Sequence, residues 1–292
     1  MISSPYFTVC ITTYKRWESC LKTIAGVISQ DFKNYEIILV DDDPGSVLPN
    51  TVKDLIEEEK LRYLPARKNL GLAASRNKAL DIAAGTYFLF CDDDDLWLPF
   101  YLSQLKDILA RDKLDFVYTY KGPVSRTIKY GWHSTFFADG FTPPVAGQCY
   151  RTSSIKDVRY GSIVQGVDHD LWISLTSKRL FGAIALSTGV VPDAFGIQKS
   201  KMTHDHERRT EKIKENFRNW DLILSENFSP NFINKFQSEY VRHLEMRKVL
   251  YELANRGVLS RIIGLIESGF FLRVLRLRLR YTFLLDPRLF FL

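Results

Sequence analysis

A chain of 292 residues with 46% hydrophobic residues can bury the core of one large domain, or of a domain with an appendage. The formal net charge of +6 is unevenly placed, because residues 256–292 contain seven arginines and two acids and the preceding residues carry only about +1. Since the basic character is confined to the C-terminus, a nucleic-acid-binding role for the whole chain is disfavoured, and we expect no nucleic-acid partner.

The cysteines and the N-terminus indicate a reducing compartment. Cys10, Cys20, Cys91 and Cys149 form no C-x-x-C pair and no regular framework, which favours buried free thiols. The chain does not begin with a basic region followed by a long apolar stretch, and it has no run of about 18 uncharged apolar residues. We therefore expect no signal peptide, no membrane-spanning helix and a cytoplasmic location.

The first half of the chain alternates apolar strands with amphipathic helices. Strands are expected at residues 7–12, 36–40, 61–64, 87–91 and 115–120. Helices are expected at residues 18–30, 52–60, 71–84 and 99–111. Because each strand is almost wholly apolar, the pattern indicates a parallel sheet that is covered on both faces. We predict an α/β fold with a Rossmann-like, mostly parallel sheet flanked by helices.

The pattern loosens after residue 120. Residues 121–145 are rich in Gly, Pro and aromatic residues, which predicts loops and an antiparallel excursion. Residues 167–180 are expected to form a helix that carries Trp172 in its apolar face, and residues 183–188 a strand. The polar and basic stretch 198–209 is predicted to be a mobile segment.

The last third of the chain is expected to be helical. Residues 210–228 and 231–255 have amphipathic helical patterns, so we divide the chain into an α/β domain at 1–210 and a helical, arginine-rich extension at 211–292. In residues 259–292 arginines interrupt apolar residues, and within 273–281 the two kinds nearly alternate, so a strand is the alternative to a helix there. As a helix this tail could lie on an anionic membrane surface with its arginine head groups snorkelling. A packing tail or an oligomer contact is the alternative.

Two clusters of carboxylates follow predicted strands, at Asp41–Asp43 and at Asp92–Asp95. In parallel sheets ligands bind beyond the carboxyl ends of the strands, so both clusters lie where a ligand is expected. Asp92 and Asp94 could hold Mg²⁺ or Mn²⁺, with water and phosphate oxygens as the remaining ligands. The alternative is a solvated acidic turn that caps the helix beginning near Pro99.

Four stretches of the chain carry a resemblance to a known family. The first is FTVCITTYKRWESCLKTIAGVISQDFKNYEIILVDDD, and the second is ARKNLGLAASRNKALDIAAGTYFLFCDDDDLWLP. The third and fourth are PPVAGQCYRTSSIKDV and GVDHDLWISL. In this order they resemble parts of the inverting glycosyltransferases of family 2: the first strand, helix and second strand; the Asn-x-Gly-Leu-Ala-x-x-x-Asn helix and the strand ending in Asp-x-Asp; a later strand and turn; and the Glu-Asp acceptor-side motif. The resemblance covers about residues 6–180 and implies the A-type nucleotide-sugar (GT-A) fold.

The resemblance implies a nucleobase pocket after the first two strands. Thr12 and Tyr14 would line it, and Asp42 would accept a hydrogen bond from the N3–H of a uracil-type base, with Asp41 the less favoured candidate. A carboxylate suits this task because its charge strengthens the bond from an imide N–H. A plain turn at Asp41–Asp43 is the structural alternative.

The resemblance also implies a diphosphate and metal site. Arg76 would lie near the nucleotide, although it could instead be an exposed helix charge. Asp92 and Asp93 would contact the nucleotide, and Asp94 and Asp92 would hold Mn²⁺ or Mg²⁺. His204 could complete the metal shell, or it could be a surface residue of the mobile segment. Asn69 and Asn77 are expected to brace loops.

Asp168 matches the second acid of the Glu-Asp motif, which implies that it is the general base for the acceptor hydroxyl. Val167 stands where the family usually has Glu, so acceptor recognition is expected to differ. Asp170 is the rival base. On a helix it would face away from Asp168, and its alternative is a helix N-terminal charge favoured by the macrodipole.

These expectations combine into an inverting, metal-dependent glycosyltransferase. The donor would be a nucleoside-diphosphate sugar, with UDP favoured, and the acceptor a hydroxyl of a glycan or lipid-linked glycan, with possible association at the inner face of a membrane. One alternative is a nucleotidyltransferase on a similar sheet, although residues 12–17 lack the Gly-rich loop that holds a triphosphate. The other is a non-catalytic glycan- or partner-binding domain, against which the intact acids argue.

Overall fold

A computed structural model describes the following residues: 4–110, 114–121, 128–138, 147–160, 167–187, 189–191, 220–226, 228–238, 241 and 268–269. At residues 167–170 the description covers the backbone only. The chain divides into two compact units, residues 1–198 and 199–292, and each is described by itself.

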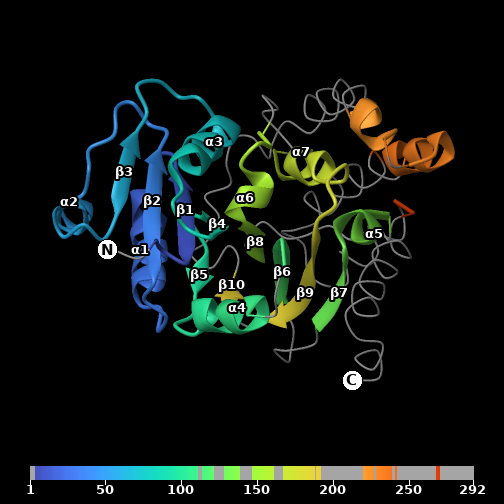
Figure 1. Cartoon of the computed structure of the whole chain (residues 1–292). Helices are drawn as coiled ribbons and strands as arrows, with labels where there is room; N and C mark the ends of the chain where they lie inside the picture. The colour runs from blue at the N-terminus through green and yellow to red at the C-terminus, as the bar shows by residue number, and fades with distance from the viewer. Residues whose placement is uncertain are drawn as a thin grey trace. The chain divides into compact units, whose positions relative to one another are not determined.

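The first unit contains an eight-stranded mixed sheet in the order β3-β2-β1-β4-β8-β6-β9-β7 (Figure 1). In chain order the strands are β1 (Phe7–Thr13), β2 (Tyr35–Asp41), β3 (Arg62–Pro65), β4 (Tyr87–Asp92), β6 (Phe116–Lys121), β7 (Ile128–Trp132), β8 (Gln148–Arg151) and β9 (Phe181–Ser187). Strands β3, β2, β1 and β4 are parallel to their neighbours, and so are β6 and β9. Strand β8 runs antiparallel to both β4 and β6, and β7 runs antiparallel to β9.

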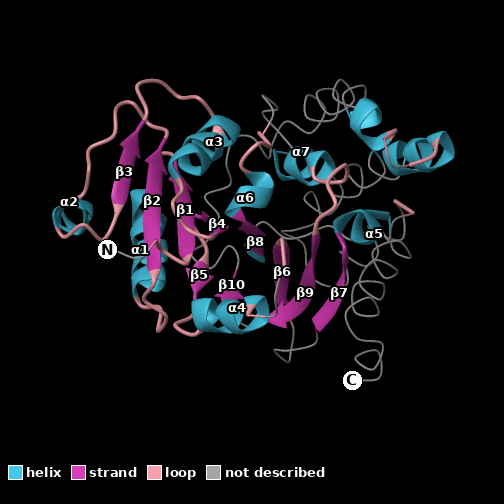
Figure 2. Cartoon of the chain, in the orientation of Figure 1, coloured by secondary structure: helices cyan, strands magenta, loops and turns pink. Residues whose placement is uncertain are grey.

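Among the described residues of the first unit, helices α1 to α7 accompany this sheet, and Figure 2 draws them in cyan. They are α1 (Trp17–Ile28), α2 (Asn50–Glu57), α3 (Leu72–Ile82), α4 (Tyr101–Leu109), α5 (His133–Ala138), α6 (Thr152–Ile155) and α7 (Val167–Ser174). A separate ribbon pairs β5 (Leu96–Trp97) with β10 (Val190–Val191) in antiparallel fashion. The mostly parallel sheet with flanking helices confirms the predicted fold class.

Apolar side chains on the two faces of the sheet form two different packing layers. Helices α1, α2 and α4 bury aliphatic residues such as Ile24, Val52 and Leu105 against one face. The other face is aromatic: Phe116 and Tyr118 lie in ring contact with His133 of α5. All four cysteines are buried and free, as predicted.

The predicted helix at residues 167–180 is too long, because α7 ends at Ser174. The Thr176 hydroxyl donates to the carbonyl oxygen of Ile173 at 2.7 Å, and the Thr176 amide bonds the same oxygen at 2.9 Å. A local side-chain bond of this kind competes with the next helical turn. Within residues 121–145 the expected antiparallel excursion is present as β7, and it is followed by α5, which was not predicted.

The second unit is described in part. Residues 220–224 are helical, within the helix expected at 210–228, and residues 230–238 are helical, beginning one residue before the helix expected at 231–255. The predicted mobile segment at 198–209 and almost all of the arginine-rich tail lie outside the described residues. Among the residues that are described, no helix has the length and apolar character needed to cross a membrane.

Candidate active site

The carboxyl ends of β1, β2 and β4 meet at one edge of the sheet. In the strand register Thr13 lies opposite Asp41 of β2, and Thr12 lies opposite Asp92 of β4. The two acidic clusters, 51 residues apart in the sequence when Asp41 and Asp92 are compared, therefore flank the same central strand. This is the edge at which parallel sheets bind ligands.

The four acids at residues 92–95 form a tight turn, and the last three of them are buried in the protein. The Asp95 amide bonds the Asp92 carbonyl at 3.1 Å, and an Asp95 carboxylate oxygen accepts from the Asp92 amide at 3.2 Å. Thr23 of α1 donates to the Asp95 carbonyl at 2.9 Å. Asp93, Asp94 and Asp95 are only 5%, 7% and 2% exposed.

These burial values contradict the alternative of a solvated turn that caps a helix. Helix α4 begins at Tyr101, its N-cap residue is Phe100, and the side chain that bonds its first turn is Gln30, whose Oε1 accepts from the Leu102 amide at 2.9 Å. Buried carboxylates are costly unless cations or hydrogen-bond donors face them. The turn must therefore be held by partners from elsewhere in the chain.

Arg76 of α3 is the partner of Asp92. Its Nη2 donates to Asp92 Oδ1 at 2.9 Å, and the arginine is only 1% exposed. The centre of the guanidinium lies 5.2 Å from the Phe90 ring centroid and 5.5 Å from that of Tyr160. Planar guanidinium groups pack favourably on aromatic faces. The alternative of an exposed helix charge for Arg76 is wrong.

Asn77 supports this arrangement, as expected of a loop-bracing residue. Its side-chain amide donates to the Tyr160 carbonyl at 2.9 Å, and its oxygen accepts from the Tyr160 amide at 3.0 Å. The two bonds tie the segment at Tyr160, which follows α6, to α3. They hold the Tyr160 ring beside the Arg76 guanidinium.

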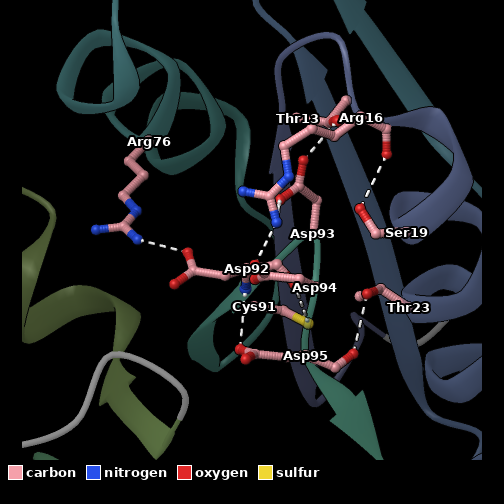
Figure 3. A network of polar contacts seen from close by, with 10 residues as sticks. All are labelled: Thr13, Arg16, Ser19, Thr23, Arg76, Cys91, Asp92, Asp93, Asp94 and Asp95. Atoms are coloured by element: carbon pink, nitrogen blue, oxygen red, sulfur yellow. Dashed lines mark hydrogen bonds and ion pairs between the residues drawn. The ribbon is translucent and has the colours of Figure 1, made fainter. Parts of the chain in front are cut away.

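Arg16 is the partner of Asp93 and Asp94 (Figure 3). Its Nη2 lies 3.2 Å from Asp93 Oδ1 and also donates to Asp94 Oδ2. Thr13 adds a bond from its hydroxyl to Asp93 Oδ2 at 2.7 Å. In Figure 3 Asp92 points toward Arg76, while Asp93 and Asp94 pair with Arg16.

Arg16 is a site residue that was not predicted. It lies at the N-cap of α1, directly after Lys15, whose φ of 57° lies in the left-handed region. The available signal was its place, since a basic residue a few positions beyond β1 reaches the edge to which Asp92 also belongs. The TTYKRW stretch contains that signal beside Thr12 and Tyr14, the two residues of it that were predicted to line the nucleobase pocket.

Burial dominates the electrostatics of Asp93. Removal from water raises the pKa of the Asp93 carboxyl to about 6, although the Thr13 hydrogen bond and the Arg16 charge both act to lower it. Around the turn two arginines face four carboxylates, so a formal charge of −2 remains when all are ionised. A divalent cation would neutralise that charge.

Asp42 is held by the loop before α3. Its two carboxylate oxygens accept from the backbone amides of Leu70, at 2.9 Å, and Gly71, at 2.7 Å. An ionised carboxylate has about four acceptor positions, so both oxygens keep capacity for a ligand. Leu70, whose amide bonds Asp42, is 38% exposed, and Tyr14, which follows the Thr13 carbonyl that accepts from the Asp42 amide, is 42% exposed. Exposed aliphatic and aromatic side chains suit the flat face of a nucleobase, and a carboxylate suits its polar edge.

The other candidates for the nucleobase pocket, Asp41 and Thr12, are buried in the protein. Asp41 is fully buried and accepts from the Tyr63 hydroxyl at 3.0 Å and from the Asp43 amide at 3.1 Å. Thr12 is 9% exposed at the end of β1. Asp42 is therefore better placed than Asp41 to reach a ligand.

Asp168 and Asp170 lie in α7, where the backbone places them in the first turn. Trp172, in the next turn, is 3% exposed and its ring lies 6.2 Å from that of His133. This packing confirms the core interpretation of Trp172. His204 lies outside the described residues.

The residues present fit a hard divalent cation. Among the described residues no group of three or more His, Cys, Asp or Glu side chains converges as a complete metal cage. Asp92 and Asp94 would thus supply one or two carboxylate ligands. Mg²⁺ and Mn²⁺ are commonly held by so few protein oxygens, with the rest supplied by phosphate and water.

The fold places the chain in a class of proteins. Its structure resembles that of S. aureus TarS in complex with UDP, with a TM-score of 0.61 and 16% identity over 91% of this chain and 79% of that one. It also resembles the mannosyltransferase PcManGT of Pyrobaculum calidifontis in complex with GDP-Man and Mn²⁺, with a TM-score of 0.55 and 14% identity over 94% and 81% of the two chains. The class is the GT-A fold.

Residues 8–165 match the profile of "Glycosyl transferase family 2", and the chain belongs to this family. A Rickettsia felis protein named "Uncharacterized glycosyltransferase" is 28% identical over 61% of this chain. The chain spans about a third of the length of that relative, since 31% of it is matched. The Escherichia coli UDP-Glc:alpha-D-GlcNAc-diphosphoundecaprenol beta-1,3-glucosyltransferase WfaP is 24% identical over 75% of this chain and 85% of its own length.

Proposed function

We propose that the chain is an inverting, metal-dependent glycosyltransferase that moves a sugar from a UDP-sugar to a hydroxyl of a lipid-linked glycan. The observation that carries the proposal is the buried acidic turn at 92–95, which is faced by two arginines and lies across β1 from Asp42. One side of this edge suits a nucleobase, and the other suits a diphosphate with its cation.

The donor nucleotide would be read at Asp42. Tyr14 and Leu70 offer the faces against which the base packs, and Asp42 accepts the imide N–H of uracil. Because the backbone amides of Leu70 and Gly71 already fix the carboxylate, little freedom is lost when it binds a base. Thr12 would line the same pocket.

The diphosphate would lie over the turn at 92–95. Asp94 and Asp92 would hold Mn²⁺ or Mg²⁺, which when bound acts as a Lewis acid toward the leaving diphosphate. Asp93 lies directly between them in the turn, and Arg76 holds Asp92 in place. His204 would complete the metal shell.

Asp168 would move the proton. Its carboxylate takes the proton of the acceptor hydroxyl as that oxygen bonds to the anomeric carbon, and the bond from this carbon to the diphosphate oxygen breaks. The products are the protonated Asp168, the glycoside and UDP. A single displacement inverts the anomeric configuration. Asp168 lies one turn before the buried Trp172, so the packing of α7 on His133 would set its position.

The acceptor class comes from the relative WfaP, whose name specifies a GlcNAc-diphosphoundecaprenol acceptor. Such an acceptor is bound to a membrane. We therefore propose that the protein is cytoplasmic and that its extension at 211–292 binds the inner face of the membrane. The domain division at residue 210 belongs to the same proposal.

The test measures release of the nucleoside diphosphate, UDP from UDP-Glc or UDP-GlcNAc and GDP from GDP-Man, each with Mn²⁺ and with or without a short-chain GlcNAc-diphospholipid. Asp94→Asn is compared with Asp54→Asn, which removes an exposed acid of α2. We expect acceptor-stimulated UDP release that Asp94→Asn abolishes and Asp54→Asn leaves unchanged. Release of pyrophosphate from a nucleoside triphosphate would support a nucleotidyltransferase instead. Lipid binding without turnover would support a non-catalytic domain.

A further inference from the structure

The two arginines that face the acidic turn, Arg76 and Arg16, differ in how freely their side chains can move. Arg76 is 1% exposed, bonds Asp92 and is enclosed by the Phe90 and Tyr160 rings. The Arg16 side chain is 26% exposed and starts from the turn before α1. Arg76 is therefore a fixed counter-ion of the turn, whereas Arg16 can leave its partners without disturbing a packed core.

The backbone before α1 aims Arg16 at the carboxylates. Lys15 has a φ of 57°, a conformation that a residue with a Cβ atom adopts at a cost. The Ser19 hydroxyl bonds the Arg16 carbonyl at 3.1 Å, and the amide of Cys20 bonds the same carbonyl at 3.0 Å. The main chain at Arg16 is thus fixed while its long side chain remains partly in solvent.

Arg16 contacts the carboxylate to which we assign the metal. Its Nη2 donates to Asp94 Oδ2 and also lies 3.2 Å from Asp93. A guanidinium and a divalent cation carry charge of the same sign, so they repel each other when both approach one buried carboxylate. Binding of the cation at Asp94 and the Arg16 contact are therefore mutually opposed.

We propose that Arg16 is an exchangeable counter-cation of the metal site: a divalent cation displaces it from Asp94, and the freed guanidinium then binds the diphosphate of the donor. The inference deepens the proposed function and depends on it for the assignment of the metal to Asp94. Arg16 stabilises the buried acids before the cation arrives. It also lowers the affinity for cation alone, so that tight metal binding requires the nucleotide.

The second half of the proposal follows from the chemistry of arginine. A guanidinium forms paired, charge-assisted bonds to phosphate oxygens as readily as to carboxylates. Fixed at its backbone and long at its side chain, Arg16 can turn from Asp94 to a diphosphate lying over the same turn. The metal and the nucleotide would then bind with positive coupling, because each favours the same position of one side chain.

The test measures binding and not turnover. Free Mn²⁺ is followed by electron paramagnetic resonance while it is titrated with wild-type protein, Arg16→Gln and Lys22→Gln. Lys22 lies in the same helix region, is paired with Glu18 on the surface, and its loss changes the net charge equally. We expect Arg16→Gln to bind Mn²⁺ about two to five times more tightly, as removal of one competing ion pair predicts. Lys22→Gln should match the wild type.

With Mn²⁺ saturating, UDP is titrated by calorimetry. Arg16→Gln should bind UDP about tenfold more weakly, because a charge-assisted phosphate contact is lost. If Arg16→Gln binds Mn²⁺ no more tightly than the wild type, the cation does not displace Arg16 from Asp94. If Arg16→Gln binds UDP as tightly as the wild type, Arg16 does not bind the diphosphate. Arg16→Lys serves if Arg16→Gln does not fold, and it should give changes of the same sign and smaller size.

Asp94→Asn separates this inference from the proposed function. If wild-type protein binds no Mn²⁺ with UDP present, or if Asp94→Asn binds it normally, the metal assignment itself is wrong. If Mn²⁺ binding requires Asp94 but does not respond to Arg16→Gln, only the exchange is wrong.

Discussion

Arg76 Nη2 lies 2.9 Å from Asp92 Oδ1, and the arginine that makes this bond is almost completely buried. The pair joins α3 to the end of β4, two elements whose side chains meet only in the folded chain. Because the Asp92 side chain is 35% exposed, water weakens its charge, whereas Arg76 has no comparable access to solvent. The pair therefore holds a charge that the protein interior could not otherwise contain.

Replacing Arg76 with Met should destabilise the fold. Asp92 would lose its cation and the rings of Phe90 and Tyr160 would lose their cation contact, so we expect the free energy of unfolding to fall by about 2–3 kcal/mol. Urea denaturation measures it. Arg62→Met is the control, since Arg62 is half exposed and makes only long contacts, to Glu36 at 3.4 Å and to the Ile82 carbonyl at 3.2 Å. Its loss should change the free energy by less than about 1 kcal/mol. Equal effects of the two substitutions would show that the Arg76 pair is not a structural element.

The buried ring of His133 should make stability depend on pH. Burial lowers the pKa of His133 from 6.5 to about 3, so between these values the unfolded chain binds a proton that the folded chain does not. Stability is therefore lost as the pH falls through this window. His133→Phe should remove this pH-dependent contribution. Between pH 8 and pH 5 the free energy of unfolding of the variant should therefore fall by about 2 kcal/mol less than that of the wild type. Chemical denaturation at each pH measures the difference, and parallel pH profiles would contradict it.

Gly85 lies where the approach to β1 leaves no room for a side chain. A Cβ atom there would lie 2.5 Å from the amide nitrogen of Thr8 and 2.6 Å from the carbonyl carbon of Phe7. Gly85→Ala should therefore cost about 2–3 kcal/mol of stability, because main-chain atoms must move. At Gly45 the nearest atom to such a Cβ is Asp43 Oδ1, at 3.7 Å. Gly45→Ala should have a denaturation midpoint close to that of the wild type. If the midpoint of Gly85→Ala is equally close, a Cβ atom at residue 85 does not clash with β1.

Asp168→Asn should abolish transfer and preserve the donor site. Loss of a general base typically lowers kcat by about 10²–10⁴-fold, while the dissociation constant for UDP should stay within about twofold. Asp170→Asn removes a carboxylate two positions along α7 and should keep most of the activity. Kinetics with the lipid acceptor and calorimetry with UDP provide the two readouts. The opposite ranking of the two variants would assign the base to Asp170.

Apart from β5, which was not predicted, the strands and helices of the first 120 residues could be predicted because their sequence pattern is local. Strand β4 is a continuous apolar run, and α1 repeats its apolar residues at helical spacing. The turn at 92–95 could be placed at a ligand-binding edge for the same reason. Strand β8 is different, because its antiparallel position between β4 and β6 depends on pairing partners distant in the sequence.

The charges of the site show the limit of sequence reasoning most clearly. Four consecutive acids are visible in any reading, but the residues that neutralise them are not. Arg16 and Asp94 are 78 positions apart, and only the register of β1 beside β4 brings them together. Likewise Arg76 shows no sign of burial in its own helix, since the enclosing rings belong to β4 and to the segment at Tyr160.

The central claim, a UDP site that needs a cation at Asp94, is tested most directly by thermal melting with UDP, with Mn²⁺ and with both. A ligand at one hundred times its dissociation constant stabilises the native state by about 2.7 kcal/mol. We predict a rise of several degrees with UDP and Mn²⁺ together, little rise with UDP and a chelator, and none with both ligands in Asp94→Asn. A folded wild-type protein whose melting temperature does not move, or an Asp94→Asn variant that responds like the wild type, would contradict the account.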